Sequence, residues 1–116
     1  MARFEVGPLP DDPLAAATLF HAEVLPGILR VLDPARHGED RFSLTLVFPL
    51  ADHTHRAWRL AAVQSLARAW APQRINGLVS DDERAIAAAD RFLAGAQGVT
   101  GQLLVLDGKD AGEMLS

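Results

Sequence analysis

The stretch of sequence that decides the fold lies near the C-terminus and reads Gly98-Val99-Thr100-Gly101-Gln102-Leu103-Leu104-Val105-Leu106-Asp107-Gly108. Its first two glycines indicate a turn, because glycine adopts backbone conformations that other residues avoid. The apolar run over residues 102–106 predicts a short strand. The stretch therefore predicts a turn that delivers the chain into the last strand of a sheet.

Upstream of this stretch, helical and strand patterns alternate. Ser80, followed three residues later by Glu83, matches a capping box and predicts the start of a helix. Strands are predicted at Arg74–Val79 and over residues 42–50, with a helix over residues 54–70 between them. Alternation of this kind implies a parallel sheet with right-handed crossover connections.

The N-terminal third adds one long helix. Asp12 and Pro13 indicate its start, because an aspartate side chain can cap a helix and proline is tolerated at the first helical position. The helix is predicted over Pro13–Leu32 with a kink at Pro26, and residues 3–6 are a candidate strand ahead of it. We therefore predict the α/β class: a truncated, Rossmann-like, three-layer α/β/α arrangement with three or four mostly parallel strands, in one domain over residues 1–116.

Composition narrows the function classes. The 116 residues carry a net charge of −4, which argues against a nucleic-acid partner because such a partner favours a basic face. The chain has no cysteine, which excludes disulfides and thiolate chemistry within it. No uninterrupted apolar run reaches the ~18 residues of a membrane span, and the first residues lack the apolar core of a signal peptide. We expect a cytoplasmic protein without a membrane partner.

The C-terminal stretch resembles the last strand of the short-chain dehydrogenase/reductase family, which usually reads Val-Thr-Gly-Gln, then apolar residues, then Asp-Gly-Gly. Lys109 stands where the family has the final glycine. Residues 61–69, with Arg74-Ile75-Asn76 after them, are similar to the helix that follows the family's catalytic lysine and to the next strand. Residues 22–26 resemble part of the family's long interface helix. The resemblance runs from about Pro13 to Gly108 and implies the C-terminal half of a Rossmann fold.

The chain departs from the family at the residues that carry the chemistry. It has neither the glycine-rich turn that receives the cofactor pyrophosphate nor the Asn-Asn-Ala-Gly segment, and the loop that carries the catalytic serine is shortened. It contains no tyrosine. The family's Tyr–Lys pair aligns with Arg56 and Leu60, or with His55 and Arg59 after a one-residue slip. We therefore predict no catalytic residues, no cofactor-binding residues and no cofactor, and we do not expect dehydrogenase activity.

The resemblance implies assembly, because family members pair around a two-fold axis through two helices. These correspond to the helices predicted here over Pro13–Leu32 and over residues 54–70. The expected partner is a second copy, giving a dimer or tetramer, or a full-length dehydrogenase subunit. Leucines on the first helix offer apolar surface, and small residues on the second let another helix approach closely; tryptophan is enriched at binding hot spots. The candidate interface residues are Leu25, Ile28, Leu29 and Leu32 on the first helix and Trp58, Ala62, Ser65 and Ala69 on the second.

Two features suggest alternatives to a non-catalytic scaffold. His53 and His55 have His-x-His spacing, which in an extended chain points both rings the same way and could grip one metal ion. A small enzyme or metal-binding protein with a new site there is the alternative function, although no third ligand is identified and no metal is predicted. Arg56, Arg59 and Arg68 place positive charge along the second helix, which reads as a solvated face or interface ion pair, with an anion site as the alternative.

The absence of the glycine-rich turn and of the Tyr–Lys pair leads to a prediction about cofactors. Isothermal titration with each of the four nicotinamide dinucleotides should give no binding heat at micromolar concentrations, because no residue pattern in the chain is suited to the pyrophosphate. A micromolar dissociation constant for any one of them would contradict the prediction. An intact short-chain dehydrogenase titrated in parallel is the positive control.

Overall fold

The computed structural model describes residues 2–34 and 42–106. Asp107 and Gly108 at the end of the C-terminal stretch, and Lys109 after them, lie outside these residues. One sheet is formed by four parallel strands in the order β1-β2-β3-β4. The strands are β1 (Ala2–Glu5), β2 (Ser43–Phe48), β3 (Arg74–Val79) and β4 (Leu103–Val105).

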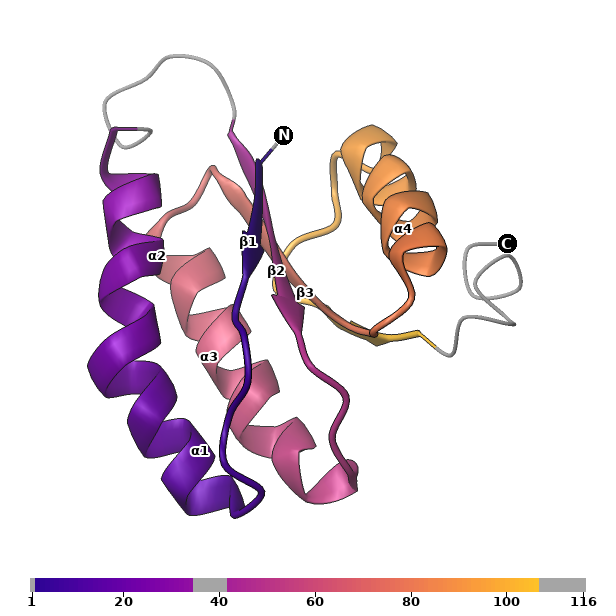
Figure 1. Ribbon diagram of the computed structural model, residues 1–116. Helices are drawn as coiled ribbons and strands as arrows, with labels where there is room; N and C mark the ends of the chain where they lie inside the picture. Colours follow the sequence, from indigo (N-terminus) through magenta and orange to yellow (C-terminus); the bar gives the residue numbers. More distant parts are fainter. Residues whose placement is uncertain (1, 35–41, 107–116) are drawn as a thin grey trace.

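Helices cover both faces of this sheet, so the predicted three-layer α/β/α arrangement is confirmed (Figure 1). One helical column is made of α1 (Pro13–Leu19), η1 (Phe20–Val24) and α2 (Leu25–Leu32). Beside it, η3 (His53–His55) leads into α3 (Arg56–Ala69), and α4 (Glu83–Gly95) lies on the opposite face. The candidate first strand does join the sheet, because β1 pairs in parallel with β2.

The two central strands are buried on both faces, as their nearly continuous apolar sequence predicts. All six residues of β2 are buried. Side chains of a strand alternate between its faces, and here Leu46 and Phe48 pack under the α1–α3 layer while Val47 packs under α4. The sheet thus separates two apolar cores.

The third crossover connection corrects the expectation of right-handed connections throughout. All three connections step in the same direction across the sheet, yet the first two place their helices on one face and α4 lies on the other (Figure 1). The β3–α4–β4 connection is therefore left-handed, whereas roughly 98% of such connections are right-handed. The apolar cores give the physical reason: Val47 and Leu78 would face water if α4 did not cover them with Ile86, Ala89 and Leu93.

The long helix begins as predicted, and its irregularity lies next to the proline. Asp12 caps α1 by accepting a hydrogen bond from the Ala15 N–H at 2.8 Å. In the middle of the column the chain makes a π-helical turn, in which the Leu25 N–H donates to the Phe20 carbonyl five residues back. Pro26 follows at the start of α2. Proline has no N–H to donate to a helical hydrogen bond. The π-helical turn places Pro26 in the first turn of α2, where this N–H is not required.

The start of α4 corrects a second expectation, because Asp82 and not Ser80 is its N-cap. The Asp82 carboxylate accepts hydrogen bonds from the N–H groups of Arg84 and Ala85. The Ser80 hydroxyl accepts from the Asp82 N–H at 3.0 Å, so it shapes the loop ahead of the helix. Glu83 makes no capping box and instead pairs with Arg3 of β1. Asp82 lies two residues closer to the helix than Ser80, so its carboxylate occupies the capping position that the sequence assigns to the serine.

Among the residues that the structure describes, the helical column Pro13–Leu32 is the one helix that could cross a membrane, judged by its length and composition alone. The mean hydropathy of 18 consecutive residues in the column is high, although polar residues interrupt its apolar run. This observation is weak evidence for a membrane, because core helices of soluble proteins and signal sequences share the same properties. Within this fold the column packs on the sheet through Phe20, Ile28 and Leu32.

The packing of β3 leads to a prediction about stability. A Cβ atom added to Gly77 would lie 2.8 Å from Leu103 Cδ1 and 3.0 Å from Val63 Cγ2, both in the core. Gly77→Ala should therefore lower the free energy of unfolding by about 1–3 kcal/mol through overpacking, as measured by urea denaturation. Gly98→Ala is the matched control, because an added Cβ there meets nothing within 4 Å. Equal stability of the two variants would show that α3 and β4 can move apart.

Candidate functional site

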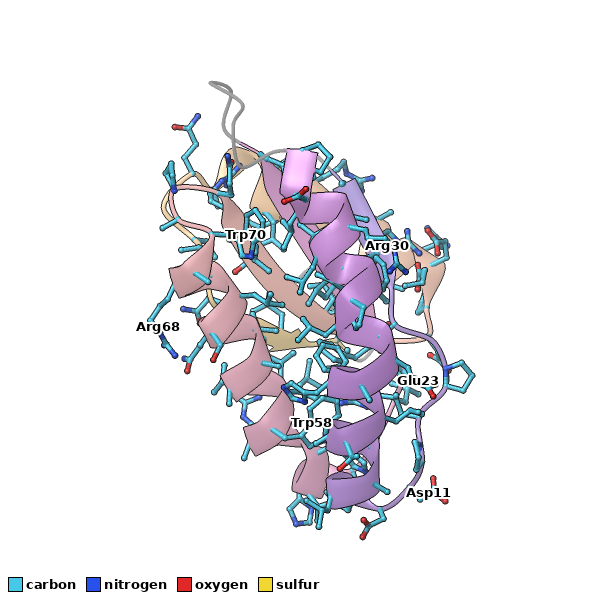
Figure 2. The ribbon with its side chains drawn as sticks, turned by 90° about the vertical axis from the view of Figure 1, so that its left-hand side faces the viewer. Asp11, Glu23, Arg30, Trp58, Arg68 and Trp70 are labelled. Carbon is cyan, nitrogen blue, oxygen red and sulfur yellow. The ribbon has the colours of Figure 1, made fainter. Side chains whose placement is uncertain are left out.

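A groove with a volume of about 400 Å³ lies between the two helical elements on the outer side of the sheet. Figure 2 looks onto this side, with the α1–α2 column and α3 next to each other and Trp58 and Trp70 between them. Five of the eight predicted interface residues line the groove. The lining residues are Phe20, His21, Leu25, Leu29, Ala62, Ser65, Leu66, Ala69 and Trp70.

The other predicted interface residues belong to the core of the single chain. Ile28 and Leu32 are fully buried between α2 and the sheet. Trp58 is half-buried, and its ring centroid lies 5.3 Å from that of Phe20 and 6.0 Å from that of Phe48. These three residues therefore stabilise the fold, and the predicted interface residues exposed in the groove are Leu29, Ser65 and Ala69, beside the exposed His21.

The His-x-His segment is a turn and not an extended strand end, which corrects the geometry expected for it. In the turn η3, His53 is exposed while His55 is buried, although both residues line one cavity. The Nε2 atom of His55 lies 2.8 Å from the Asp11 carbonyl and its Nδ1 atom lies 3.2 Å from Trp58 Nε1. Because the indole N–H can only donate, Nδ1 accepts and Nε2 carries the proton that is donated to Asp11.

Asp52 is the N-cap of this turn. Its carboxylate accepts hydrogen bonds from the backbone N–H and the hydroxyl of Thr54. These hydrogen bonds, together with the nearby His55 and His53, hold the pKa of the Asp52 carboxyl below its usual range. The carboxylate is therefore engaged in capping over the physiological pH range. Among the described residues there is no group of three or more histidine, cysteine and acidic side chains that could hold a metal ion.

Arg59 corrects part of the sequence interpretation, which placed it with Arg56 and Arg68 on a solvated face or in an interface ion pair, with an anion site as the alternative. The structure buries its side chain, which is only 2% exposed, and its Nη1 donates to the Pro49 carbonyl at 2.8 Å. The signal was available in the helical spacing. His55, Arg59 and Leu66 lie at i, i+4 and i+11 and so share the stripe that faces the sheet.

The structure also separates the two alignments with the family's Tyr–Lys pair. Arg56 is exposed and Leu60 is half-buried, whereas His55 and Arg59 both turn inward at the carboxyl ends of the strands. Of the two aligned pairs, His55 and Arg59, which result from the one-residue slip, are thus the pair that faces the sheet. Within the described part of the chain, its hydrogen bonds go to main-chain carbonyls and to Trp58, so the pair tethers loops and has no phenol to transfer a proton.

A protein-family model described as "Short chain dehydrogenase-like protein" matches residues 4–106. The chain belongs to this family. The short chain dehydrogenase-like match extends from β1 to the residue after β4, so it covers every strand of the described sheet. It confirms the relationship that the C-terminal stretch suggests. Neither the comparison with curated proteins nor that with solved structures found a match.

The turn at His53 and His55 leads to a prediction about metals. Elemental analysis of protein purified without an affinity tag should find no stoichiometric zinc, nickel or copper, because both His55 nitrogens have partners and the described residues include no group of three potential ligands. One ion per chain that disappears in His53→Ala would contradict this expectation. His21→Ala serves as the control, because His21 lies on the helical column away from the turn.

Proposed function

We propose that this short chain dehydrogenase-like chain is a non-catalytic subunit that assembles through its helical layer, with a second copy of itself as the partner. The observation that carries the proposal is the state of the helical column Pro13–Leu32. The column is apolar enough to pass for a membrane helix, yet only 17% of its most apolar window is buried within the chain. Its outward apolar surface is therefore available to a partner.

Exposed apolar side chains on this column support the proposal. Leu14 is 77% exposed, and Leu29 and Val31 are each 38% exposed. Burying apolar surface is the main favourable contribution to most protein–protein association. At roughly 25 cal/mol per Å² of apolar surface removed from water, side chains of this size contribute on the order of 1 kcal/mol each when covered.

The neighbouring helix α3 is suited to receive another helix. Ala61, Ser65 and Ala69 are exposed and four residues apart, so they form a row of small side chains on one face. Small residues permit a short distance between helix axes, which lies at about 8–10 Å in packed pairs. The row borders the groove that Leu25 and Leu29 line on its other side.

A second copy fits this surface because one face carries both the projecting and the receiving part. In a two-fold interface the same patch serves both molecules and must be complementary to itself. Here the exposed Leu29 lies beside a groove of about 400 Å³, so the leucine of one copy could enter the groove of the other. The resemblance adds that family members pair through the corresponding helices. A full-length dehydrogenase subunit, which would offer the same kind of helical face, is the alternative partner.

The non-catalytic part of the proposal is supported by the residues at the strand ends. The chain has no tyrosine, and the proton on His55 Nε2 is already donated to a backbone carbonyl. A general acid or base must reach the reacting proton itself. His55 would have to give up Asp11 and Trp58 before it could do so. A cytoplasmic location remains an expectation from the sequence.

Leu29→Asp tests the assembly. The wild-type chain should sediment as a dimer or a larger oligomer at micromolar concentration. The variant should be a folded monomer, because an unpaired carboxylate would be buried at the centre of the interface while the exposed position tolerates it in one chain. Analytical ultracentrifugation gives the mass and circular dichroism shows that the variant is folded.

Phe92→Asp is the matched control, because Phe92 is similarly exposed at 41% but lies on α4, on the other face of the sheet. Dissociation by Phe92→Asp and not by Leu29→Asp would move the interface to α4. A wild-type chain that is a stable monomer alone, but forms a complex when co-expressed with a full-length dehydrogenase, would replace the self-assembly with the alternative partner. A stable monomer in both experiments would refute the proposal.

A further inference from the structure

Arg59 is a buried cation without a counter-ion among the described residues. Its Nη1 has the Pro49 carbonyl, but its Nε is buried with no hydrogen-bond partner in the part of the chain that the structure describes. The two ion pairs found there both belong to Arg3. The guanidinium carbon lies 5.0 Å from the ring centroid of Phe48 and 5.6 Å from that of Trp58, so aromatic rings are its main neighbours.

The charge persists in spite of this burial. Burial lowers the pKa of the Arg59 guanidinium from its usual value. An arginine nevertheless keeps its proton in proteins at neutral pH, because its pKa starts above about 12. Cation–π contacts offset part of the cost of removing the charge from water, but they provide no acceptor for Nε. A buried donor without an acceptor is unfavourable, so an incoming acceptor would be stabilised.

The arginine lines a cavity of about 250 Å³ at the carboxyl ends of β3 and β4. Its larger apolar side chains are Val79, Leu103 and Val105, and Ala51 also lines it. The carboxyl ends of the strands are where open α/β sheets tend to bind ligands. The volume lies slightly below the ~300–1,000 Å³ of pockets for drug-sized molecules, so the cavity suits a small ligand.

The charges around this cavity favour an anion over a cation. Arg56 and Arg59 line it together with His53 and His55, and Asp52 is the acidic residue in this lining. The Asp52 carboxylate is already engaged with Thr54. A second cavity of about 290 Å³ shares Asp52 and Arg59 but adds Asp11 and lacks Arg56, so it is less suited to negative charge.

We propose that the cavity at the ends of β3 and β4 binds a small monocarboxylate with a short apolar chain. The carboxylate pairs with the guanidinium of Arg59, and the apolar chain lies along Val79, Leu103 and Val105. A ligand with one anionic end and one apolar end matches this lining, because the cavity offers the guanidinium of Arg59 and also aliphatic side chains. The site goes beyond the proposed assembly and does not depend on it, because the cavity and the interhelical groove share no lining residue.

Titration with sodium butyrate, followed by NMR, tests the site. Butyrate should shift the Arg59 Nε–H resonance and the methyl resonances of Val79 and Val105 in a saturable way at millimolar concentrations. Butyramide, which has the same shape without the charge, should bind at least roughly tenfold more weakly, because hydrogen bonds to charged groups are the stronger ones. Inorganic phosphate is the comparison for an anion without an apolar chain.

Arg59→Met and Arg59→Lys separate the role of the charge from that of the fold. The Met variant should lose the butyrate response, and the Lys variant should retain part of it. Arg68→Met is the matched control, because Arg68 lies on the same helix and does not line the cavity. If the Met variant does not fold, the butyrate–butyramide comparison on the wild-type chain decides the matter.

The proposal would be overturned by the absence of a saturable response to butyrate, by an equal response to butyramide, or by a folded Arg59→Met variant that still binds butyrate. A stronger response to phosphate than to butyrate would also overturn it, because it would assign the site to an inorganic or phosphorylated anion.

Discussion

Parallel pairing between β2 and β3 is the constraint on which the rest of this structure depends. Both strands are almost entirely buried, and each parallel pair needs a crossover that runs back along the sheet. The crossovers of β1–β2 and β2–β3 lie on one face, which brings the α1–α2 column and α3 next to each other. The interhelical groove is therefore a direct product of the strand order. The same order leaves the opposite face to α4, and this requirement overrides the usual hand of the third connection.

Much of the fold could be predicted from the sequence, because strand and helix periods are local properties. The strand Arg74–Val79 was predicted to the residue, and Asp12 was identified as a cap. The hand of the β3–α4–β4 connection could not be predicted, because it is decided by which face of the sheet still needs cover. The predicted N-cap of α4 was wrong for a more local reason. Serine and aspartate both cap helices well, and the path of the loop determines that Asp82 and not Ser80 takes the capping position.

The candidate site shows a different limit, which concerns the direction of side chains. Arginine is almost never fully buried unless it is paired, so Arg59 reads as a solvent-facing residue in any list of charges. Its helical spacing with His55 and Leu66 points inward, and the structure follows the spacing. Similarly, the His53–His55 pair is expected in extended chain, whereas Asp52 caps a turn there that buries His55 and leaves His53 exposed. In both cases tertiary packing overrode the usual behaviour of the residue type.

The edge strand β1 shows how charge limits unwanted pairing. Within the described part of the chain β1 pairs only with β2, and an unpaired strand edge invites another strand. Arg3 carries a charge there and pairs with both Glu5 and Glu83, and this pairing holds the pKa of the Glu83 carboxyl below its usual range. A carboxyl with a lowered pKa contributes stability above its unfolded pKa and loses it as the pH falls through the folded value. Acid should therefore weaken the tie between β1 and α4 before it affects the apolar cores.

His55 of η3 and Arg59 of α3 both face inward, and their hydrogen bonds favour the proposal that the strand ends bind a ligand. His55 donates its one proton to the Asp11 carbonyl, in the loop after β1, and Arg59 donates from Nη1 to the Pro49 carbonyl, in the loop after β2. A donor that tethers a loop cannot also present that proton to a substrate. The imidazole is thereby fully used, since its other nitrogen accepts from Trp58. The guanidinium has five N–H donors, so it can hold a loop and still offer charge and hydrogen bonds to a ligand.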